Sequence, residues 1–298
     1  MNYINILQKA CFDVGNCACM GLDPVSKFIP KSDLDETGII PFFEELFNAM
    51  QKEGLMPSAF KANIGYYTIY DKPFASSFSG SIALAGTLSL VKKYFKDIPI
   101  ILDSKRGDIA TSSLNYAKEA FDVWEASATT VSPYMGGDSI EPFISNSYKE
   151  KAIYILARTS NMGAVDFQNL FLYKDEDTTK KDMLYMKVAR KIVSYAKEGF
   201  FVGAVVGAKG LTELKDIASF FTSNITGGIP LLIPGVGSQG GSAEEVLSIL
   251  KTCKYDLSLV RINSSSALTH PWKNEKVPSN CIEECLKNIR SFFTSCKI

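Results

Sequence analysis

The sequence predicts a single α/β domain, residues 1–298, folded as a (β/α)8 TIM barrel. Short apolar segments recur along the chain, and each is followed by a stretch with helical spacing, which is typical of parallel sheets. Eight such segments can be counted, and closing eight strands into a barrel leaves no exposed sheet edge. A length of 298 residues also suits one large barrel domain.

The predicted strands are residues 17–23, 59–64, 98–103, 128–133, 152–157, 202–207, 230–234 and 257–263. Helical spacing is clearest at residues 40–52, 112–124 and 243–250. Residues 163–181 are longer than a usual connection between a strand and a helix, and they form either a lid or a surface excursion. Their mixed charge favours the surface excursion.

Composition argues against several classes of partner. Lys plus Arg and Asp plus Glu both number 32, so no overall field attracts nucleic acid or a membrane, and an anionic ligand needs a local cluster of cations. The N-terminus lacks the pattern of a signal peptide, and the most apolar stretch, residues 81–91, is too short to span a bilayer. Seven scattered cysteines indicate reduced thiols, and we therefore expect a soluble, cytoplasmic protein.

A zinc site is a formal alternative use of the cysteines. Cys281 and Cys285 are spaced to share one face of a helix, but the chain has no CxxC pair and His270 is its one histidine. His270 precedes a proline in a polar stretch, which predicts a surface position. No metal is therefore expected.

In a barrel of this kind the chemistry lies at the C-terminal ends of the strands. Asp103 ends a predicted strand, and Lys105 follows two residues later, so both side chains point to the same side in extended geometry. Asp108 comes after a glycine that permits a sharp turn. Asp108 belongs either to the same polar cluster or to the cap of the following helix.

Lys61 favours the cluster. It lies inside an apolar strand (AFKANI), where an unpaired ammonium costs several kcal/mol. Asp103, at the end of the adjacent strand, is the expected partner. Lys61, Asp103, Lys105 and Asp108 would then form a nearly neutral array of alternating charge, which suits electrostatic catalysis.

These residues resemble the motif of a known enzyme family. The run DSKRGDI resembles the Asp-x-Lys-x-x-Asp signature of orotidine 5'-monophosphate decarboxylases. MGLDP around Asp23, FKANIGYY around Lys61, LARTSN around Thr159 and PGVGSQGGS around Gln239 are similar to stretches of that family and occur in its order. The resemblance covers residues 17 to about 266, and the chain length is similar to the branch with larger subunits.

The resemblance implies decarboxylation of orotidine 5'-monophosphate to uridine 5'-monophosphate in de novo pyrimidine biosynthesis, without a metal or organic cofactor. It implies that Lys105 protonates C6 and that Asp103 lies against the substrate carboxylate. Asp23, Lys61 and Asn63 are expected at the ribose. Other implied binding residues are Thr159 and Ser160 at the pyrimidine, Gln239 at the phosphate, and Pro234, Gly237, Ser264 and Ser265.

The resemblance also implies a homodimer with shared active sites, because Asp108 and Ile109 reach the neighbouring subunit's site in this family, and Ser112 stands where threonine is more usual. The charge requirement of the reaction agrees with this residue set. Loss of CO2 leaves an unconjugated electron pair on C6, which fixed positive charge must stabilise.

One position departs from the family pattern. The family carries a phosphate-binding arginine directly after an Asn-Ser-Ser-like stretch, and here Ser266 stands in that place. Arg261 either reaches the phosphate through a shifted strand register or is a barrel side chain paired to a carboxylate. Two rival functions therefore remain: a magnesium-dependent sugar-phosphate enzyme of the same superfamily, which Lys61 and Asn63 on the second strand argue against, and a non-catalytic nucleotide-binding homologue.

Overall fold

The structure is a computed structural model that describes residues 2–31, 37–174, 177–237, 240–273 and 275–298. Among these residues, eight parallel strands close into a barrel in the order β1-β2-β3-β4-β5-β8-β9-β10, with β10 returning to β1. The predicted barrel is confirmed. The strands are β1 (Ala18–Gly21), β2 (Ala59–Asn63), β3 (Ile100–Arg106), β4 (Ala128–Val131), β5 (Ala152–Arg158), β8 (Val202–Val206), β9 (Leu231–Pro234) and β10 (Val260–Ser264).

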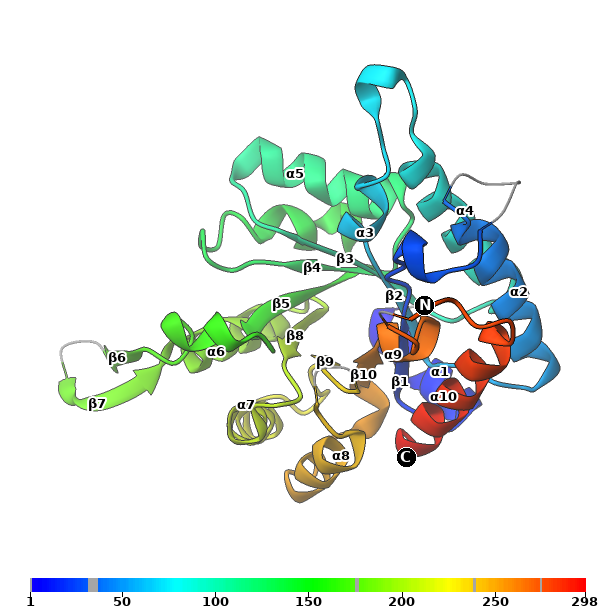
Figure 1. The fold of residues 1–298 in the computed structure, drawn as a ribbon. Helices are drawn as coiled ribbons and strands as arrows, with labels where there is room; N and C mark the ends of the chain where they lie inside the picture. Colours follow the sequence, from blue (N-terminus) through cyan, green and yellow to red (C-terminus); the bar gives the residue numbers. More distant parts are fainter. Residues whose placement is uncertain (1, 32–36, 175–176, 238–239, 274) are drawn as a thin grey trace.

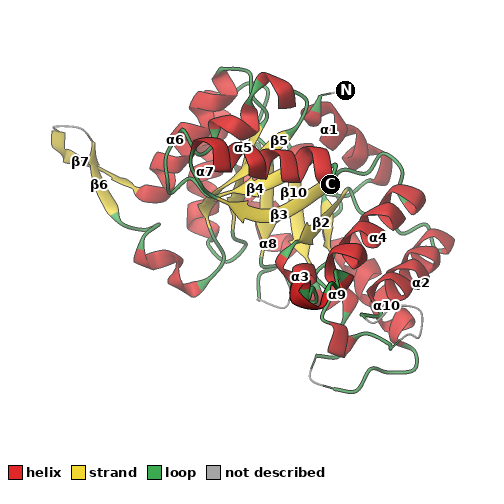
Figure 2. Ribbon diagram, turned by 90° about the horizontal axis from the view of Figure 1, so that it is seen from above, coloured by secondary structure: helices red, strands yellow, loops and turns green. Residues whose placement is uncertain are grey.

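Helices surround the barrel and cover the outer face of its strands (Figures 1 and 2). They are α2 (Ile39–Lys52), α4 (Ser79–Tyr94), α5 (Ala110–Lys118), α6 (Leu184–Lys197), α7 (Leu211–Asn224), α8 (Ala243–Thr252) and α10 (Cys281–Ser295), with the short α3 (Gly65–Thr68) and α9 (Ser266–Thr269) at the ends of β2 and β10. Two details differ from the sequence prediction. α5 passes into a π-helical turn, Glu119–Val123, and the β4–β5 connection carries the 3-10 helices Glu141–Ile144 and Asn146–Tyr148.

The inside of the barrel is apolar at one end and polar at the other. Side chains alternate between the two faces of a strand, and the inward positions of β2 and β3 read Ala59, Lys61 and Ile101, Asp103 from the start of each strand. The apolar members join one buried cluster inside the barrel. The polar members all lie toward the C-terminal ends, so the alternation alone places the polar site at that mouth.

Helix α1 (Tyr3–Val14) fills the opposite end of the barrel. Tyr3 and Leu7 are fully buried in the interior cluster, and the Tyr3 hydroxyl lies 3.0 Å from that of Tyr154. Arg261 lies at this end as well. Its guanidinium donates to the carbonyls of Ser58, Ser258, Val260 and Leu7 at 2.5–3.1 Å.

Both predicted roles of Arg261 are therefore wrong. Its side chain is fully buried and its hydrogen-bond partners are main-chain carbonyls at the start of the barrel strands, not a phosphate site and not a carboxylate. The reason is depth in the barrel: Arg261 shares the inward face of β10 with Asn263 but lies two residues before it, one layer below the mouth.

Strand β3 is longer than predicted. It continues to Arg106, and its register against β4 shifts between Leu102 and Arg106. Lys105 lies within the irregular part and has a φ of 46°, in the left-handed region that side chains other than glycine seldom adopt. Such strain persists where surrounding contacts impose it and is concentrated at functional sites.

The long connection after β5 contains structure of its own. A 3-10 helix, Met162–Asp166, is followed by the antiparallel strands β6 (Phe171–Lys174) and β7 (Asp177–Met183). Both ribbon views show these strands projecting away from the barrel (Figures 1 and 2). This arrangement favours the predicted surface excursion over a lid.

The described helices include none with both the length and the apolar character needed to cross a membrane.

Candidate active site

A cavity of about 860 Å³ opens at the C-terminal mouth of the barrel. This volume is within the usual range for a site that holds a small-molecule ligand. Ten of the residues predicted to bind or transform substrate line it: Asp23, Lys61, Asn63, Asp103, Lys105, Thr159, Ser160, Pro234, Ser264 and Ser265.

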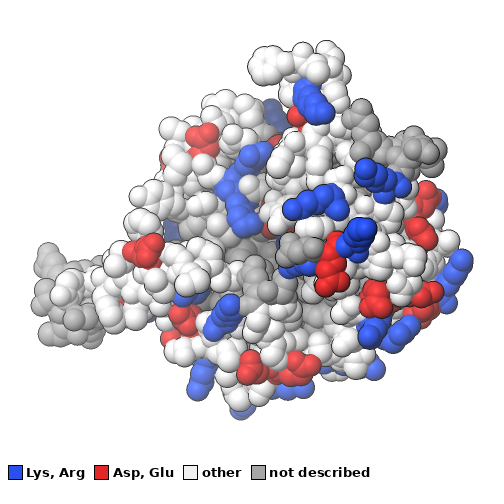
Figure 3. All heavy atoms as spheres, viewed as in Figure 1, with Lys and Arg blue, Asp and Glu red and all other residues white. Residues whose placement is uncertain are grey.

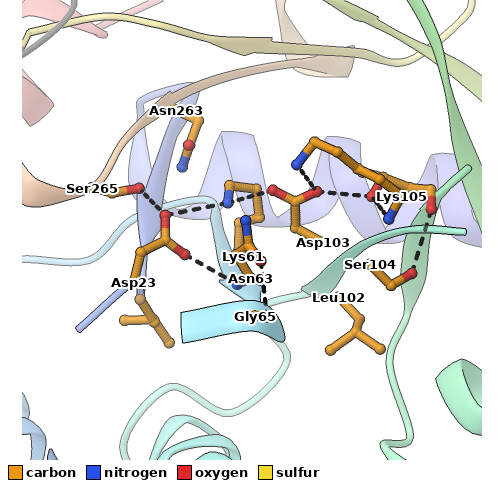
Figure 4. Close-up of polar contacts among 12 residues, drawn as sticks. Asp23, Lys61, Asn63, Gly65, Leu102, Asp103, Ser104, Lys105, Asn263 and Ser265 are labelled. Carbon is orange, nitrogen blue, oxygen red and sulfur yellow. Dashed lines mark hydrogen bonds and ion pairs between the residues drawn. The ribbon is translucent and has the colours of Figure 1, made fainter. Parts of the chain in front are cut away.

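A row of alternating charges crosses the cavity (Figure 4). The Lys61 Nζ lies 2.9 Å from Asp103 Oδ2 and 3.5 Å from Asp23 Oδ2. The Lys105 Nζ lies 2.6 Å from Asp103 Oδ1. The predicted pairing of Lys61 with Asp103, and of Asp103 with Lys105, is confirmed by these distances.

The electrostatics keep Asp103 and Lys61 charged at neutral pH. Burial alone would raise the pKa of Asp103, but Lys61 and Lys105 outweigh burial and hold that pKa well below its usual range. Burial alone would lower the pKa of Lys61, but Asp103 and Asp23 outweigh it and raise that pKa above its usual value. The side chain of Lys105 is 47% exposed, so its ammonium faces the open cavity while its partner carboxylate is buried.

Thr130 on β4 orients this row and was not predicted. Its buried hydroxyl donates to Asp103 Oδ1 at 2.8 Å and accepts a hydrogen bond from the Lys105 main-chain N–H at 2.9 Å. One hydroxyl therefore fixes both the carboxylate and the strained backbone of the lysine. The available signal was a second threonine in the strand ATTV, at the parity that faces the cavity.

Asp23, at the end of β1, makes a second group of polar contacts in the cavity. Its carboxylate accepts hydrogen bonds from the Asn63 main-chain N–H at 3.0 Å and from the Ser265 hydroxyl at 2.6 Å. The Ser265 contact depends on Gly21, because a Cβ on Gly21 would lie 1.8 Å from the Ser265 Oγ. The glycine in MGLDP thus lets β10 approach β1 closely enough for this bond.

Thr159 and Ser160 lie at the end of β5, across the cavity. Gln168, in the connection that follows β5, makes two hydrogen bonds with Thr159. Its Oε1 accepts one from the Thr159 main-chain N–H at 2.7 Å, and its Nε2 donates one to the Thr159 hydroxyl at 2.8 Å. Gln168 also lines the cavity. No sequence pattern pointed to Gln168, because no secondary structure was predicted for residues 163–181.

The end of β9 and β10 forms the remaining wall, with Pro234, Ser264 and Ser265. Gly237 lies just behind this wall, since a Cβ on it would lie 3.2 Å from the Ser264 Oγ, and its φ of 82° suits glycine. Gln239 lies outside the described residues.

Asp108, Ile109 and Ser112, which were predicted to reach a neighbouring subunit's site, also lie outside the cavity lining. The Asp108 carboxylate accepts the Ile109 main-chain N–H at 2.8 Å, and the Ile109 side chain is half exposed. Asp108 is not the N-cap of α5 either, because Ile109 occupies that position.

The predicted surface position of His270 is wrong. His270 is buried, stacks on Phe28 with ring centroids 5.8 Å apart, and lines the cavity. The polar stretch around it misled the prediction, because α9 turns the ring inward. Cys285 lies nearby and donates to the Thr269 carbonyl, and the described residues contain no cluster of His, Cys, Asp and Glu that could hold a metal ion.

Comparison with known proteins gives one consistent result. Residues 18–252 match the model of the orotidine 5'-phosphate decarboxylase / HUMPS family. The orotidine 5'-phosphate decarboxylase of Phocaeicola vulgatus is 34% identical over 95% of this chain and 93% of its own length, and that of Herpetosiphon aurantiacus is 36% identical over 77% of each chain.

A solved structure described as Leishmania donovani OMP decarboxylase is 26% identical, covers 99% of both chains and superimposes with a TM-score of 0.71. The family that the five sequence motifs indicated is thus confirmed. The chain belongs to the orotidine 5'-phosphate decarboxylase / HUMPS family.

Proposed function

We propose that this enzyme removes CO2 from orotidine 5'-monophosphate to give uridine 5'-monophosphate, a step of de novo pyrimidine biosynthesis. Besides the family, one observation carries the proposal: a cavity-facing ammonium, Lys105, is held 2.6 Å from a buried carboxylate, Asp103, that stays ionised. This arrangement supplies both fixed charge and a proton donor.

The reaction breaks the bond between C6 and the carboxyl carbon and leaves the electron pair on C6. Positive charge that is already in place stabilises such a pair without reorganisation. The Lys105 ammonium supplies that charge and then transfers a proton to C6, and water later reprotonates the amine. Asp103 lies against the substrate carboxylate, so charge repulsion there is relieved as neutral CO2 departs.

The rest of the cavity binds the nucleotide in this proposal. Asp23, Lys61 and Asn63 contact the ribose. Thr159 and Ser160 recognise the pyrimidine edge, and the wall at the end of β9 and β10, with Gln239, receives the phosphate. Such remote contacts can contribute to the rate when they are realised mainly in the transition state.

We further propose a homodimer with shared sites, in which Asp108, Ile109 and Ser112 complete the partner subunit's cavity. Two observations support this. Asp108 lies outside its own cavity, and exposed apolar side chains follow it in the sequence: Ile109 is 50% exposed and Leu114 is 38% exposed. Exposed apolar surface of this kind is typical of protein interfaces.

We also propose that the reaction needs no metal or organic cofactor and occurs in the cytoplasm. The first point is supported by the Lys/Asp row, which provides the charge that a cation would otherwise supply. The second is supported by the cysteines, all of which are free thiols.

The decisive assay follows the ultraviolet absorbance of orotidine 5'-monophosphate mixed with purified, chelator-treated protein. Rapid conversion to uridine 5'-monophosphate supports the reaction and its independence of metal together. Conversion that needs added Mg²⁺ would contradict the cofactor-free mechanism. Binding without conversion would identify a non-catalytic homologue, the alternative that Ser266 raises.

The shared site is tested by complementation. Lys105→Ala and Asp108→Ala enzymes are each expected to be inactive but folded. After subunit exchange, each mixed dimer contains one intact site, so random mixing should restore about a quarter of the wild-type activity. Proven exchange without recovered activity would contradict the shared site.

A further inference from the structure

We propose that Lys273 provides the cation that binds the substrate's 5'-phosphate in this enzyme, in place of the arginine that the family resemblance puts at position 266. The inference rests on the proposed function, because it assigns a residue to the phosphate of that substrate. Lys273 was not among the predicted site residues, and it lines the cavity beside Ser266 and His270.

Charge balance in the cavity is the first argument. The acidic lining residues are Asp23 and Asp103, and two lysines, Lys61 and Lys105, pair with them. These four groups sum to zero, whereas a nucleotide phosphate brings about two negative charges at neutral pH. Lys273 is the remaining lysine of the described lining, and no carboxylate in the described part of the chain forms an ion pair with it.

Three other basic side chains are poor candidates for this role. Arg261 is committed to carbonyls at the opposite end of the barrel. Arg158 forms an ion pair with Glu213 and donates to the Thr159 carbonyl. His270 is not a competing cation, because burial, and then the charge of Lys273, lowers its pKa to about 4.

The position of Lys273 is fixed by its neighbours. The Trp272 indole Nε1 donates to the Phe28 carbonyl at 2.9 Å, and the His270 ring stacks on the Phe28 ring. These contacts attach the segment after α9 to the β1–α2 connection, and Lys273 in this segment lines the cavity. The long, flexible side chain then reaches a phosphate as a point charge.

The surrounding surface offers no substitute for a local cation. Figure 3 shows acidic and basic side chains interspersed over the face turned to the viewer, and the whole chain has no net charge. Because such a surface gives little general attraction for an anion, phosphate affinity should depend strongly on one well-placed lysine.

The test compares binding of uridine 5'-monophosphate with binding of uridine, measured by calorimetry on the full-length enzyme. Lys273→Met should weaken binding of the nucleotide about 10- to 100-fold, the effect of one charge-assisted contact, and leave uridine binding unchanged. Lys276→Met, three residues away and outside the cavity lining, is the matched control and should alter neither. Ser266→Arg in the Lys273→Met background should restore nucleotide affinity.

Equal weakening for nucleotide and nucleoside, or a Lys273→Met enzyme that behaves as the Lys276→Met control, would overturn the assignment. So would a phosphate-selective loss in Lys209→Met instead, since Lys209 lies against Gly240 on the neighbouring loop. Binding does not require turnover. A wild-type enzyme that binds uridine 5'-monophosphate but fails to decarboxylate therefore rejects the proposed function while the Lys273 comparison still stands.

Discussion

Replacing Thr130 with valine keeps its shape and removes its hydroxyl. The change deletes the bond to the Asp103 carboxylate and leaves the Lys105 N–H, whose backbone is in the left-handed region, without its acceptor. A hydrogen bond to a charged group contributes about 1.5–3 kcal/mol, and an unsatisfied buried donor costs about 1–3 kcal/mol. We therefore expect the free energy of unfolding to fall by roughly 2.5–6 kcal/mol.

Catalysis should suffer separately, because the hydroxyl orients both members of the ion pair. If 1.5–3 kcal/mol of orientation is lost in the transition state, kcat falls about 10- to 150-fold. Urea unfolding and steady-state decarboxylation measure the two effects. Thr130→Ser keeps the hydroxyl and should retain most of the activity.

Thr129→Val is the matched control for this experiment. Thr129 is also buried on β4, but its hydroxyl donates to the Leu102 carbonyl and contacts Ser104, not the charged row. It should lose stability with little change in kcat. Equal kcat losses in the Thr129→Val and Thr130→Val enzymes, or none in the latter, would refute the orienting role of Thr130.

Three further changes test other parts of the structure. The lowered pKa of Asp103 stabilises the folded protein above the unfolded pKa near 3.9, and this stabilisation is lost as the pH falls toward the folded pKa. Asp103→Asn should therefore flatten the decline in the free energy of unfolding between about pH 4 and pH 2. An unchanged dependence of that free energy on pH would contradict the pKa shift. Arg261→Met should lower the free energy of unfolding by about 3–6 kcal/mol, because it leaves buried carbonyls without donors. Nucleotide affinity measured by calorimetry should stay within about twofold of wild type. A loss of affinity without a loss of stability would indicate that Arg261 binds the phosphate after all. Gly21→Ala should displace Ser265 from Asp23, destabilise the fold by about 1–3 kcal/mol and weaken binding of uridine in calorimetry; intact stability and binding would show that β10 can move aside.

The barrel and the centre of the site were predictable because they follow from local patterns. Short apolar segments, each followed by a stretch with helical spacing, predicted the strands, and a lysine inside the apolar run AFKANI required a carboxylate on a neighbouring strand. Asp103 satisfied that requirement at 2.9 Å. Pairing of this kind depends on the order of adjacent strands, which a barrel fixes.

The wrong predictions and the missed residues have another cause: their positions depend on tertiary geometry that the local sequence does not determine. Arg261 was misplaced because its depth in the barrel follows from the register of β10, and His270 because the turn of α9 buries a ring within a polar stretch. Gln168 reaches Thr159 from a connection whose course had no recognisable pattern. Trp272, the neighbour of Lys273, is held by the Phe28 carbonyl, which is distant in the sequence.

Helix α1 closes the end of the barrel opposite the cavity. Tyr3 and Leu7 occupy the axis at the end opposite the cavity, and Arg261 binds the helix to the strands above it. Tight packing of this kind leaves no passage through the described interior. Nucleotide and CO2 must therefore pass through the mouth of the barrel at the C-terminal ends of the strands, and not along the barrel axis.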